Sequence, residues 1–482
     1  MAKTDHSLDV DSGPAVNVLV QEKLEASYLA SQKEGTKRSK SSFLAALALF
    51  AVLSVGLSLN QFEKLKPGDF PVNTWTTWAI SDFLQEKQKN DVVFLGSSLM
   101  LVPLDGVDAD FLGKPIDASA HHRSLYFEDA FKKDSGHSLK SYNFALPGEM
   151  PSDAYLTLKG MLSTAHRPDV VIYGVAPRDF IDSQLSSPTD TEPFHFLSRL
   201  VSTDDCASGL FRDPLGRLSW FINRKLYFAH HAIDWQMLLE RKTNRVLSIL
   251  TPLPYGSKPY TFWQRTALLP KYKAGEIHPN AVITHPVTKE VAKATFKDNT
   301  GEYKERYKRA DRHTYATQLY FLGKLANLCK KERIELILIN MPIARENINV
   351  LGAPTYLDYV STLKERAYAL NIPFYDLNFF YLYNTDLYHD YVHLNAFGGA
   401  KFLDSLVSVL NSDPRAQLAM QMAGRELWKQ EQMNKLATPV NDATDSIHRL
   451  KEKLIEHNLI QTSAGHGSIS KLREIVKQEG DR

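Results

Sequence analysis

The sequence predicts an α/β protein: a three-layer αβα domain built on a parallel sheet and interrupted by a large insertion. Two observations predict this fold class. Short apolar runs alternate with longer segments of helical spacing, and several runs end in a glycine-containing or polar turn. The runs are apolar along their whole length, which is typical of parallel strands that helices cover on both faces.

The composition is that of a globular protein, and it excludes several classes. Hydrophobic residues make up 43% of the 482 residues and charged residues 23%, so wholesale disorder is not expected. Lysine and arginine number 57 against 55 aspartate and glutamate, so no basic excess indicates a nucleic-acid partner. The two cysteines, Cys206 and Cys329, are too few for a disulfide-rich scaffold or a cysteine-ligated zinc site. One bridge between them is compatible with an oxidising compartment.

The first expected element is a transmembrane anchor at residues 41–60, after a flexible cytoplasmic arm at 1–40. Residues 43–59 are apolar apart from two serines and one glycine. As a helix this run reaches about 25 Å, the short end of a bilayer span. Basic residues precede the run, which favours a cytoplasmic N-terminus and an extracytoplasmic main domain in a single-pass protein.

Two other interpretations of this run stay open. A cleaved signal peptide would suit its length, but about forty mostly polar residues precede it, too many for an ordinary signal sequence. A buried core helix would normally show a polar stripe, and this run has none.

A stem is expected at residues 61–90 and the first half of the α/β domain at residues 91–185. Each expected strand is a short apolar run, and the helix between two of them has helical spacing. The expected strands are 91–95, 142–145 and 169–173, and the expected helix is 151–166.

The next segment, about 140 residues without this rhythm, is too long for a bare loop. We interpret residues 186–311 as an inserted cap, helical at first and irregular around 252–254. It holds Trp220, Trp235 and Trp263 with several basic residues, so a polymer-binding surface and an ordinary core both stay open.

The rhythm returns in residues 312–411, the expected second half of the α/β domain. A polar tail at residues 412–482 is expected to be helical in pieces. The expected helices of the second half are 314–331, 356–369 and 395–410, and the expected strands are 335–339 and 373–376.

Ser98 is the candidate nucleophile. It follows the first strand in the turn Gly96-Ser97-Ser98, and ligand sites of parallel sheets form at the carboxyl ends of the strands. A serine between strand and helix is exposed at this edge, with its backbone N–H facing the same site. An ordinary helix N-cap is the alternative.

Asp390 and His393 are the candidate partners of the nucleophile. They are three residues apart and can meet within one turn. A carboxylate on one imidazole nitrogen orients the ring and leaves the other nitrogen as a base. A surface turn without catalytic meaning is the alternative.

Asn143 and Gly148 are candidates for stabilising an oxyanion. They follow the second strand, and Gly148 closes a Pro-Gly turn. A small residue there lets a backbone N–H approach a developing negative charge. A plain turn is the alternative.

Together these blocks resemble the SGNH/GDSL hydrolase superfamily. Gly96-Ser97-Ser98 stands where Gly-Asp-Ser usually stands, and residues 390–393 match the last block, Asp-x-x-His. Residues 143–148 resemble Asn-x-Gly-x-x-Gly, with Ala145 replacing the first glycine. The resemblance covers about residues 90–180 and 312–411.

The resemblance implies an SGNH-like fold and a serine acyl-ester chemistry. Ser98, His393 and Asp390 would form the triad, and the backbone N–H groups of Ser98 and Gly148 would stabilise the oxyanion, with Asn143 or Arg178 assisting. This chemistry needs no metal and no organic cofactor.

The third block departs from the family pattern. Where the family has Gly-x-Asn-Asp, this chain reads Gly174-Val175-Ala176-Pro177, and Ala176 has no side-chain donor in the asparagine's place. Arg178 is expected to line the site instead. Ion pairs with Asp179 or Asp182 are the alternative for this arginine.

With its anchor, the chain is similar to membrane-anchored SGNH proteins that act beside multispanning membrane-bound O-acyltransferases, as in alginate O-acetylation and teichoic acid D-alanylation. The resemblance implies acyl transfer to a glycan or cell-envelope polymer, with such an acyltransferase as partner. A carbohydrate or lipid esterase is one alternative. A non-catalytic envelope scaffold or binding protein is another.

Two further features are interpreted as structural. His121 and His122 have no other ligand at a recognisable spacing, so we expect a surface doublet rather than a metal site. The charged segment 449–456 is expected to be a solvated helix face, with partner binding as the alternative.

Overall fold

The computed structural model describes residues 42–57, 74–86, 88–163, 167–185, 187–232, 239, 283–308, 312–379, 381–425 and 427–429. Several predicted features lie outside these residues. They are the arm at 1–40, the first part of the stem at 61–73, the irregular part of the cap with Trp235 and Trp263, and the tail beyond residue 429.

A five-stranded parallel sheet forms the centre of the molecule, which confirms the predicted fold class. Every neighbouring pair of strands runs parallel, in the order β3-β1-β4-β6-β7. All five strands arise from the apolar runs of the sequence. They are β1 (Val92–Gly96), β3 (Ser141–Asn143), β4 (Val170–Val175), β6 (Glu335–Asn340) and β7 (Phe374–Asp376).

The strand order places a topological switch point between β1 and β4. From β1 the chain moves outward to β3 on one side, and it then crosses back to β4 on the other side. Connections on either side of such a point leave the sheet toward opposite faces, and a crevice opens at the carboxyl ends of the two strands. A ligand site is therefore expected where β1 and β4 end.

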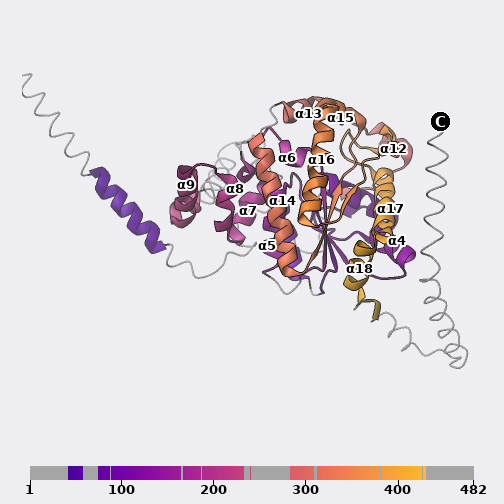
Figure 1. Cartoon of the computed structure of the whole chain (residues 1–482), viewed down its shortest axis with the longest axis horizontal. Helices are drawn as coiled ribbons and strands as arrows, with labels where there is room; N and C mark the ends of the chain where they lie inside the picture. Colours follow the sequence, from indigo (N-terminus) through magenta and orange to yellow (C-terminus); the bar gives the residue numbers. More distant parts are fainter. Residues whose placement is uncertain are drawn as a thin grey trace, which may run out of the picture.

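Helices cover the sheet in two groups, as right-handed crossovers in opposite directions require. In one group α5 packs against α14, and α14 against α16; in the other α17 packs against both α3 and α4 (Figure 1). The first group is α5 (Pro151–Met161), α14 (Arg312–Glu332) and α16 (Ala353–Leu370). The second is α3 (Ser98–Leu112), α4 (Leu125–Ser135) and α17 (Ala396–Ser412).

The core follows from the apolar strands. Every residue of β1 and β4 is buried, because helices cover both faces of the sheet. The five strands therefore hold their carboxyl ends in fixed positions, which suits a site that requires precise distances.

The end of the stem folds onto this core. Helix α2 (Trp75–Gln85) packs against α5 and against α7 (Glu192–Leu200) of the inserted segment. Thr74 caps the helix by accepting the backbone N–H of Thr77, and Trp78 is buried. The tryptophan belongs to the core and not to an exposed interface.

The described parts of the inserted segment, residues 187–232 and 283–308, also pack onto the domain. α13 contacts α6 (Arg178–Ile181) and α15 (Arg345–Leu351), and β5 pairs antiparallel with β2 (Ile116–Asp117). Trp220 packs against Phe194 and Phe211, so it is a core residue of the segment. The remaining elements of the segment are η2 (Pro188–Asp190), η3 (Asp204–Cys206), α8 (Ala207–Leu210), α9 (Pro214–Lys225), α10 (Tyr227–His230), β5 (Ile283–Thr284), α12 (Lys289–Ala294) and α13 (Thr300–Tyr307).

Beyond β7, the 3₁₀ turn η5 (Thr385–Leu387) leads to the loop that precedes α17, and α18 (Pro414–Ala423) follows α17. α18 packs against α17. It is the described part of the tail for which helical pieces were predicted.

Residues 42–57 are helical, and their large apolar side chains are exposed, with Phe43 at 66% and Leu44 at 63%. Among the residues that the structure describes, no helix combines the length and the apolar character needed to cross a membrane. The predicted span of residues 41–60 extends past both ends of the described helix and stays a prediction.

The cysteines and the histidine doublet have structural explanations. Cys206 and Cys329 are both buried and free, so the bridge that the sequence left open does not form. His121 pairs with Asp108 and His122 with Asp82. Within the described ranges no cluster of potential metal ligands exists.

Candidate active site

The nucleophile turn lies at the carboxyl end of β1. Gly96 ends the strand with φ +146°, and a Cβ there would stand 2.7 Å from the carbonyl oxygen of Gly174 on β4. Only glycine fits here, because the backbones of the neighbouring strands β1 and β4 approach too closely for a side chain. Ser97 then occupies the N-cap position and Ser98 begins α3, half-buried at the switch point.

His393 reaches this serine from the far end of the chain. Its Nε2 lies 2.8 Å from Ser98 Oγ, across 295 residues of sequence. Its Nδ1 lies 2.8 Å from Asp390 Oδ2 and 3.0 Å from Oδ1. The structure thus brings the three predicted residues into one hydrogen-bonded chain.

The Asp390 carboxylate also holds its own loop. Its Oδ1 accepts the backbone N–H groups of His393 at 2.8 Å and Val392 at 2.9 Å. Burial alone would raise the pKa of Asp390, but these bonds and the charge of His393 hold it below its ordinary value. The carboxylate stays ionised and keeps the imidazole oriented.

The neighbouring histidine of the loop adds no competing charge to the Asp390–His393 pair. His389 lies beside Asp390 and His393, and burial lowers the pKa of its imidazole, so it stays neutral near pH 7. A proton on Nδ1 of His393, facing the carboxylate, leaves Nε2 as an acceptor for the hydroxyl proton of Ser98. The arrangement can therefore activate a serine.

Gly148 and Arg178 lie together at the opposite side of the crevice. Gly148 has φ +80°, and a Cβ on it would stand 3.4 Å from Nη2 of Arg178. The arginine begins α6, directly after β4. The segments after β3 and β4 thus bring the backbone of Gly148 close to a guanidinium, and both are candidate donors to an oxyanion.

The Arg178 guanidinium is fixed by two buried carboxylates. Its Nε donates to Asp182 at 3.1 Å, and its Nη1 lies 3.5 Å from Asp179. Burial would lower the pKa of Arg178, but these two carboxylates raise it above its ordinary value. Both predicted ion pairs are present. Nη2 donates to no side chain of the described residues, so the guanidinium still has a nitrogen available to bind another acceptor.

Asn143 does not join this group. It is 2% exposed, its Nδ2 donates to Asp105 at 3.4 Å and its Oδ1 accepts the N–H of Ala145 at 3.2 Å. These contacts engage both ends of its amide inside the protein. They do not support the predicted role of Asn143 in oxyanion stabilisation.

Glu149 is a site residue that the sequence did not reveal. Its Oε2 accepts the N–H of Gly96 at 3.1 Å and of Leu146 at 3.3 Å. It ties the nucleophile turn to the turn that carries Gly148. Burial raises its pKa well above the ordinary value. A lone glutamate after a Pro-Gly turn gives no pattern that could have predicted this.

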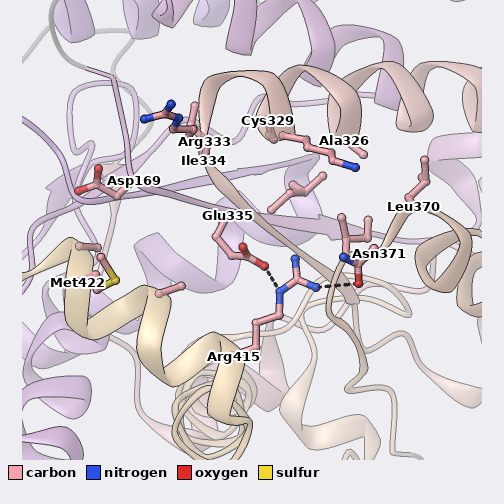
Figure 2. Close-up of a pocket in the computed structure, with 15 residues that line it drawn as sticks. Asp169, Ala326, Cys329, Arg333, Ile334, Glu335, Leu370, Asn371, Arg415 and Met422 are labelled. Atoms are coloured by element: carbon pink, nitrogen blue, oxygen red, sulfur yellow. Dashed lines mark hydrogen bonds and ion pairs between the residues drawn. The ribbon is translucent and has the colours of Figure 1, made fainter.

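A separate cavity lies at the opposite edge of the sheet, where β4 and β6 begin (Figure 2). It measures about 440 Å³ and includes Asp169, Glu335 and Arg415 in its lining. Arg415 pairs with Glu335 at 2.7 Å and donates to Asn371 at 3.2 Å. None of Ser98, Asp390 and His393 lines this cavity, so it is not the site of the chemistry considered above.

Comparison with known proteins adds little. No family model and no curated protein matches the chain. A proposed acylhydrolase from Bacteroides fragilis, solved as a crystal structure, is similar at 10% identity and a TM-score of 0.27. The match covers 75% of this chain and 98% of that one. This likeness is too weak to argue from, so the chemistry rests on the geometry of the site.

Proposed function

We propose that the chain is a serine acyl-ester enzyme of the SGNH type. The observation that carries this proposal is the hydrogen-bonded chain from Ser98 through His393 to Asp390, located at the switch point of a parallel sheet. A hydroxyl, an imidazole and a carboxylate in this order are what nucleophilic acyl chemistry requires.

In the first half-reaction, Ser98 Oγ bonds to the ester carbonyl carbon while His393 Nε2 takes its proton. The carbonyl oxygen becomes an oxyanion. The N–H groups of Ser98 and Gly148, with Arg178, are the donors proposed to stabilise it. The bond to the leaving alcohol then breaks, and His393 returns the proton to that oxygen.

In the second half-reaction, water or an acceptor hydroxyl attacks the acyl group on Ser98. His393 takes the proton of the attacking oxygen and passes it to Ser98 Oγ as the acyl–serine bond breaks. Water gives a free acid and a sugar hydroxyl gives a new ester. The same residues thus serve hydrolysis and transfer.

The finer proposal is transfer to a glycan or another cell-envelope polymer, with a multispanning membrane-bound O-acyltransferase as partner. It rests on the resemblance of the sequence blocks and on the N-terminal segment. Hydrolysis of carbohydrate or lipid esters is one alternative function, and a non-catalytic envelope scaffold is another.

The location proposed is a single-pass anchor with the main domain outside the cytoplasm. The exposed apolar side chains of helix 42–57 support it, because aqueous surfaces rarely carry such a contiguous apolar face. Sedimentation of the full chain with membranes after alkaline extraction tests it. A variant that lacks residues 43–59 should leave the pellet, and its retention there would contradict the anchor.

The catalytic proposal is tested with the detergent-solubilised full chain and an aryl acetate. We expect Ser98→Ala and His393→Ala each to lower kcat by about 10³-fold or more. Ser135→Ala is the matched control, because its hydroxyl bonds only to nearby backbone, donating to the carbonyl of Phe131 and accepting the N–H of His137. Full activity in Ser98→Ala would rule out catalysis by Ser98, whereas an inactive wild type would leave the non-catalytic scaffold as the surviving interpretation.

An oligosaccharide acceptor separates transfer from hydrolysis. If the enzyme is a transferase, acylated oligosaccharide should form at the expense of free acetate as the acceptor concentration rises. If the yield of free acetate does not change when an acceptor is added, the result favours an esterase.

A further inference from the structure

Helix α13, part of the inserted segment, is fastened at its beginning to the loop that carries Asp390. The N–H of Lys297 donates to the carbonyl of His389 at 2.9 Å. The N–H of Tyr391 donates to Oδ1 of Asn299 at 3.2 Å. These two bonds flank Asp390, so the start of α13 moves with the catalytic loop.

The other end of α13 is fastened to the segment that carries Arg178. Ser183 donates its N–H to the carbonyl of Arg306 at 2.8 Å and its hydroxyl to that of Glu305 at 2.6 Å. Arg306 also pairs with Asp182, the carboxylate that holds Arg178. α13 therefore spans the crevice from the Asp390 loop to α6 and lies beside α15 (Figure 1).

Tyr303 lies in the middle of this bridge. It is 5% exposed, and the guanidinium of Arg306 sits over its ring at 5.9 Å. Arg306 in turn pairs with Asp182, which holds Arg178, so Tyr303 belongs to the same packed cluster as the Arg178 guanidinium. The Tyr303 hydroxyl donates to no group of the described residues, unlike Tyr307 one turn later, whose hydroxyl donates to Asn347 at 3.0 Å.

Burial raises the pKa of Tyr303 far above neutrality, more than the nearby arginines lower it. Its hydroxyl therefore keeps its proton and is a neutral donor. Arg178 Nη2 is a second donor without a partner among the described residues. One neutral and one cationic donor in a partly buried crevice suit an oxygen that gains negative charge.

We propose that Tyr303 is a catalytic residue of the inserted segment: its hydroxyl and Arg178 Nη2 together bind the carbonyl oxygen of the acyl group as it becomes an oxyanion. This inference rests on the proposed function, and it gives the inserted segment a direct part in the chemistry. A donor that acts mainly on the transition state raises kcat and leaves KM nearly unchanged.

Tyr303→Phe removes the hydroxyl and keeps the ring. We expect kcat for the aryl acetate to fall about 10- to 100-fold, with KM within about twofold of the wild type. Tyr307→Phe is the matched control in the same helix. It should lower the melting temperature, because Asn347 loses its donor, but change kcat by less than about threefold.

A binding measurement separates a catalytic from a structural role. An aryl boronate forms a tetrahedral adduct with a serine nucleophile and presents an oxygen to the oxyanion donors. Tyr303→Phe should weaken boronate binding about tenfold or more, and Tyr307→Phe should not. Arg178→Lys combined with Tyr303→Phe should lose less than the product of the two single effects, because both donors serve one oxygen.

The outcomes are distinct. Tyr303→Phe with wild-type kcat and wild-type boronate affinity overturns the role of Tyr303 while Ser98 keeps its own. Equal losses in Tyr303→Phe and Tyr307→Phe, matched by equal losses of melting temperature, also overturn it. If instead Ser98→Ala hydrolyses the ester as fast as the wild type, the proposed function fails before this inference is reached.

Discussion

At the scale of single residues, Asp390 has two tasks in one loop. It orients the imidazole of His393 and accepts two backbone N–H groups of the same turn. The spacing of three residues makes this possible, because a carboxylate at the start of a tight turn faces the N–H groups two and three residues later. The loop is thus arranged before substrate binds.

Asp390→Asn tests the orienting task. An amide can donate to Nδ1 and so favour the wrong tautomer of His393, as is known for serine triads. We expect kcat to fall about 10³- to 10⁴-fold with little change in melting temperature, measured with the aryl acetate and by thermal unfolding. Asp386→Asn, in the exposed turn just before the loop, is the control. Activity above a tenth of the wild type in Asp390→Asn would contradict the role.

Glu149 gives a second test, because one substitution removes only its ionisable group and another removes its whole hydrogen-bonding side chain. Glu149→Gln keeps a side-chain oxygen that can accept the N–H groups of Gly96 and Leu146. We expect kcat within about fivefold of the wild type. Glu149→Ala removes the side-chain acceptor of the Gly96 N–H, while the Leu146 N–H keeps its bond to the carbonyl of Gly96 at 2.9 Å, so we expect a cost of about 1–3 kcal/mol. Denaturant unfolding of both variants measures this, and equal stability of the two would refute the linking role.

The residues that the sequence revealed are those whose chemistry is local. Ser98 and the Asp390–His393 pair were predictable because each sits in a short pattern at a predicted strand end or turn. Asn143 was predicted to assist oxyanion stabilisation, a role that its contacts do not support, since only the fold shows that Asp105 lies beside it. Glu149 and Tyr303 carry no pattern, because their positions depend on contacts between distant segments.

At the scale of elements, the turn from β1 to α3 depends on close contact between backbones. Gly96 combines a positive φ with a carbonyl oxygen 2.7 Å from where a Cβ would be. We expect Gly96→Ala to lower the unfolding free energy by about 3 kcal/mol and to displace Ser98. Denaturant unfolding and the ester assay measure the two effects.

Gly113→Ala is the control for this prediction. Gly113 has φ +63° at the end of α3, and nothing lies within 4 Å of its Cβ position. It should cost about 1 kcal/mol and keep activity. If the Gly96→Ala and Gly113→Ala variants were equally stable and active, the close approach of the neighbouring strands β1 and β4 would not be the reason that position 96 requires glycine.

The short runs that alternate with helical segments predicted all five strands of the sheet, most clearly β1 and β4, whose residues are all buried. α3 was not delimited, because it is buried on nearly all sides and contains Pro103, so no polar stripe marks it. The pair β2–β5 has two residues in each strand. Such short pairing depends on tertiary contact and leaves no periodic signal.

At the scale of the whole molecule, several carboxyl groups are buried in the α/β domain and in the inserted segment. Burial raises the pKa of each, to about 6 for Asp91 and Asp179, about 7 for Glu192 and about 8 for Asp153. In the unfolded chain such groups titrate near pH 4. Between about pH 4 and 8 the folded protein therefore binds more protons than the unfolded chain.

This difference sets the direction of the pH dependence. Stability falls with rising pH wherever the folded state holds more protons, so the unfolding free energy of the full chain should decline from about pH 6 to pH 9. Burial lowers the pKa of His389, which opposes this trend only below about pH 6.5.

Glu192→Gln keeps an oxygen for the hydroxyl of Thr76, which now donates to Glu192, and removes one titrating group. It should reduce the decline between pH 6 and pH 9 by about 1.4 kcal/mol. Denaturant unfolding at pH 6 and pH 9 measures both proteins, and a wild-type stability that rises over this range would show that the buried carboxyls are already ionised in the fold.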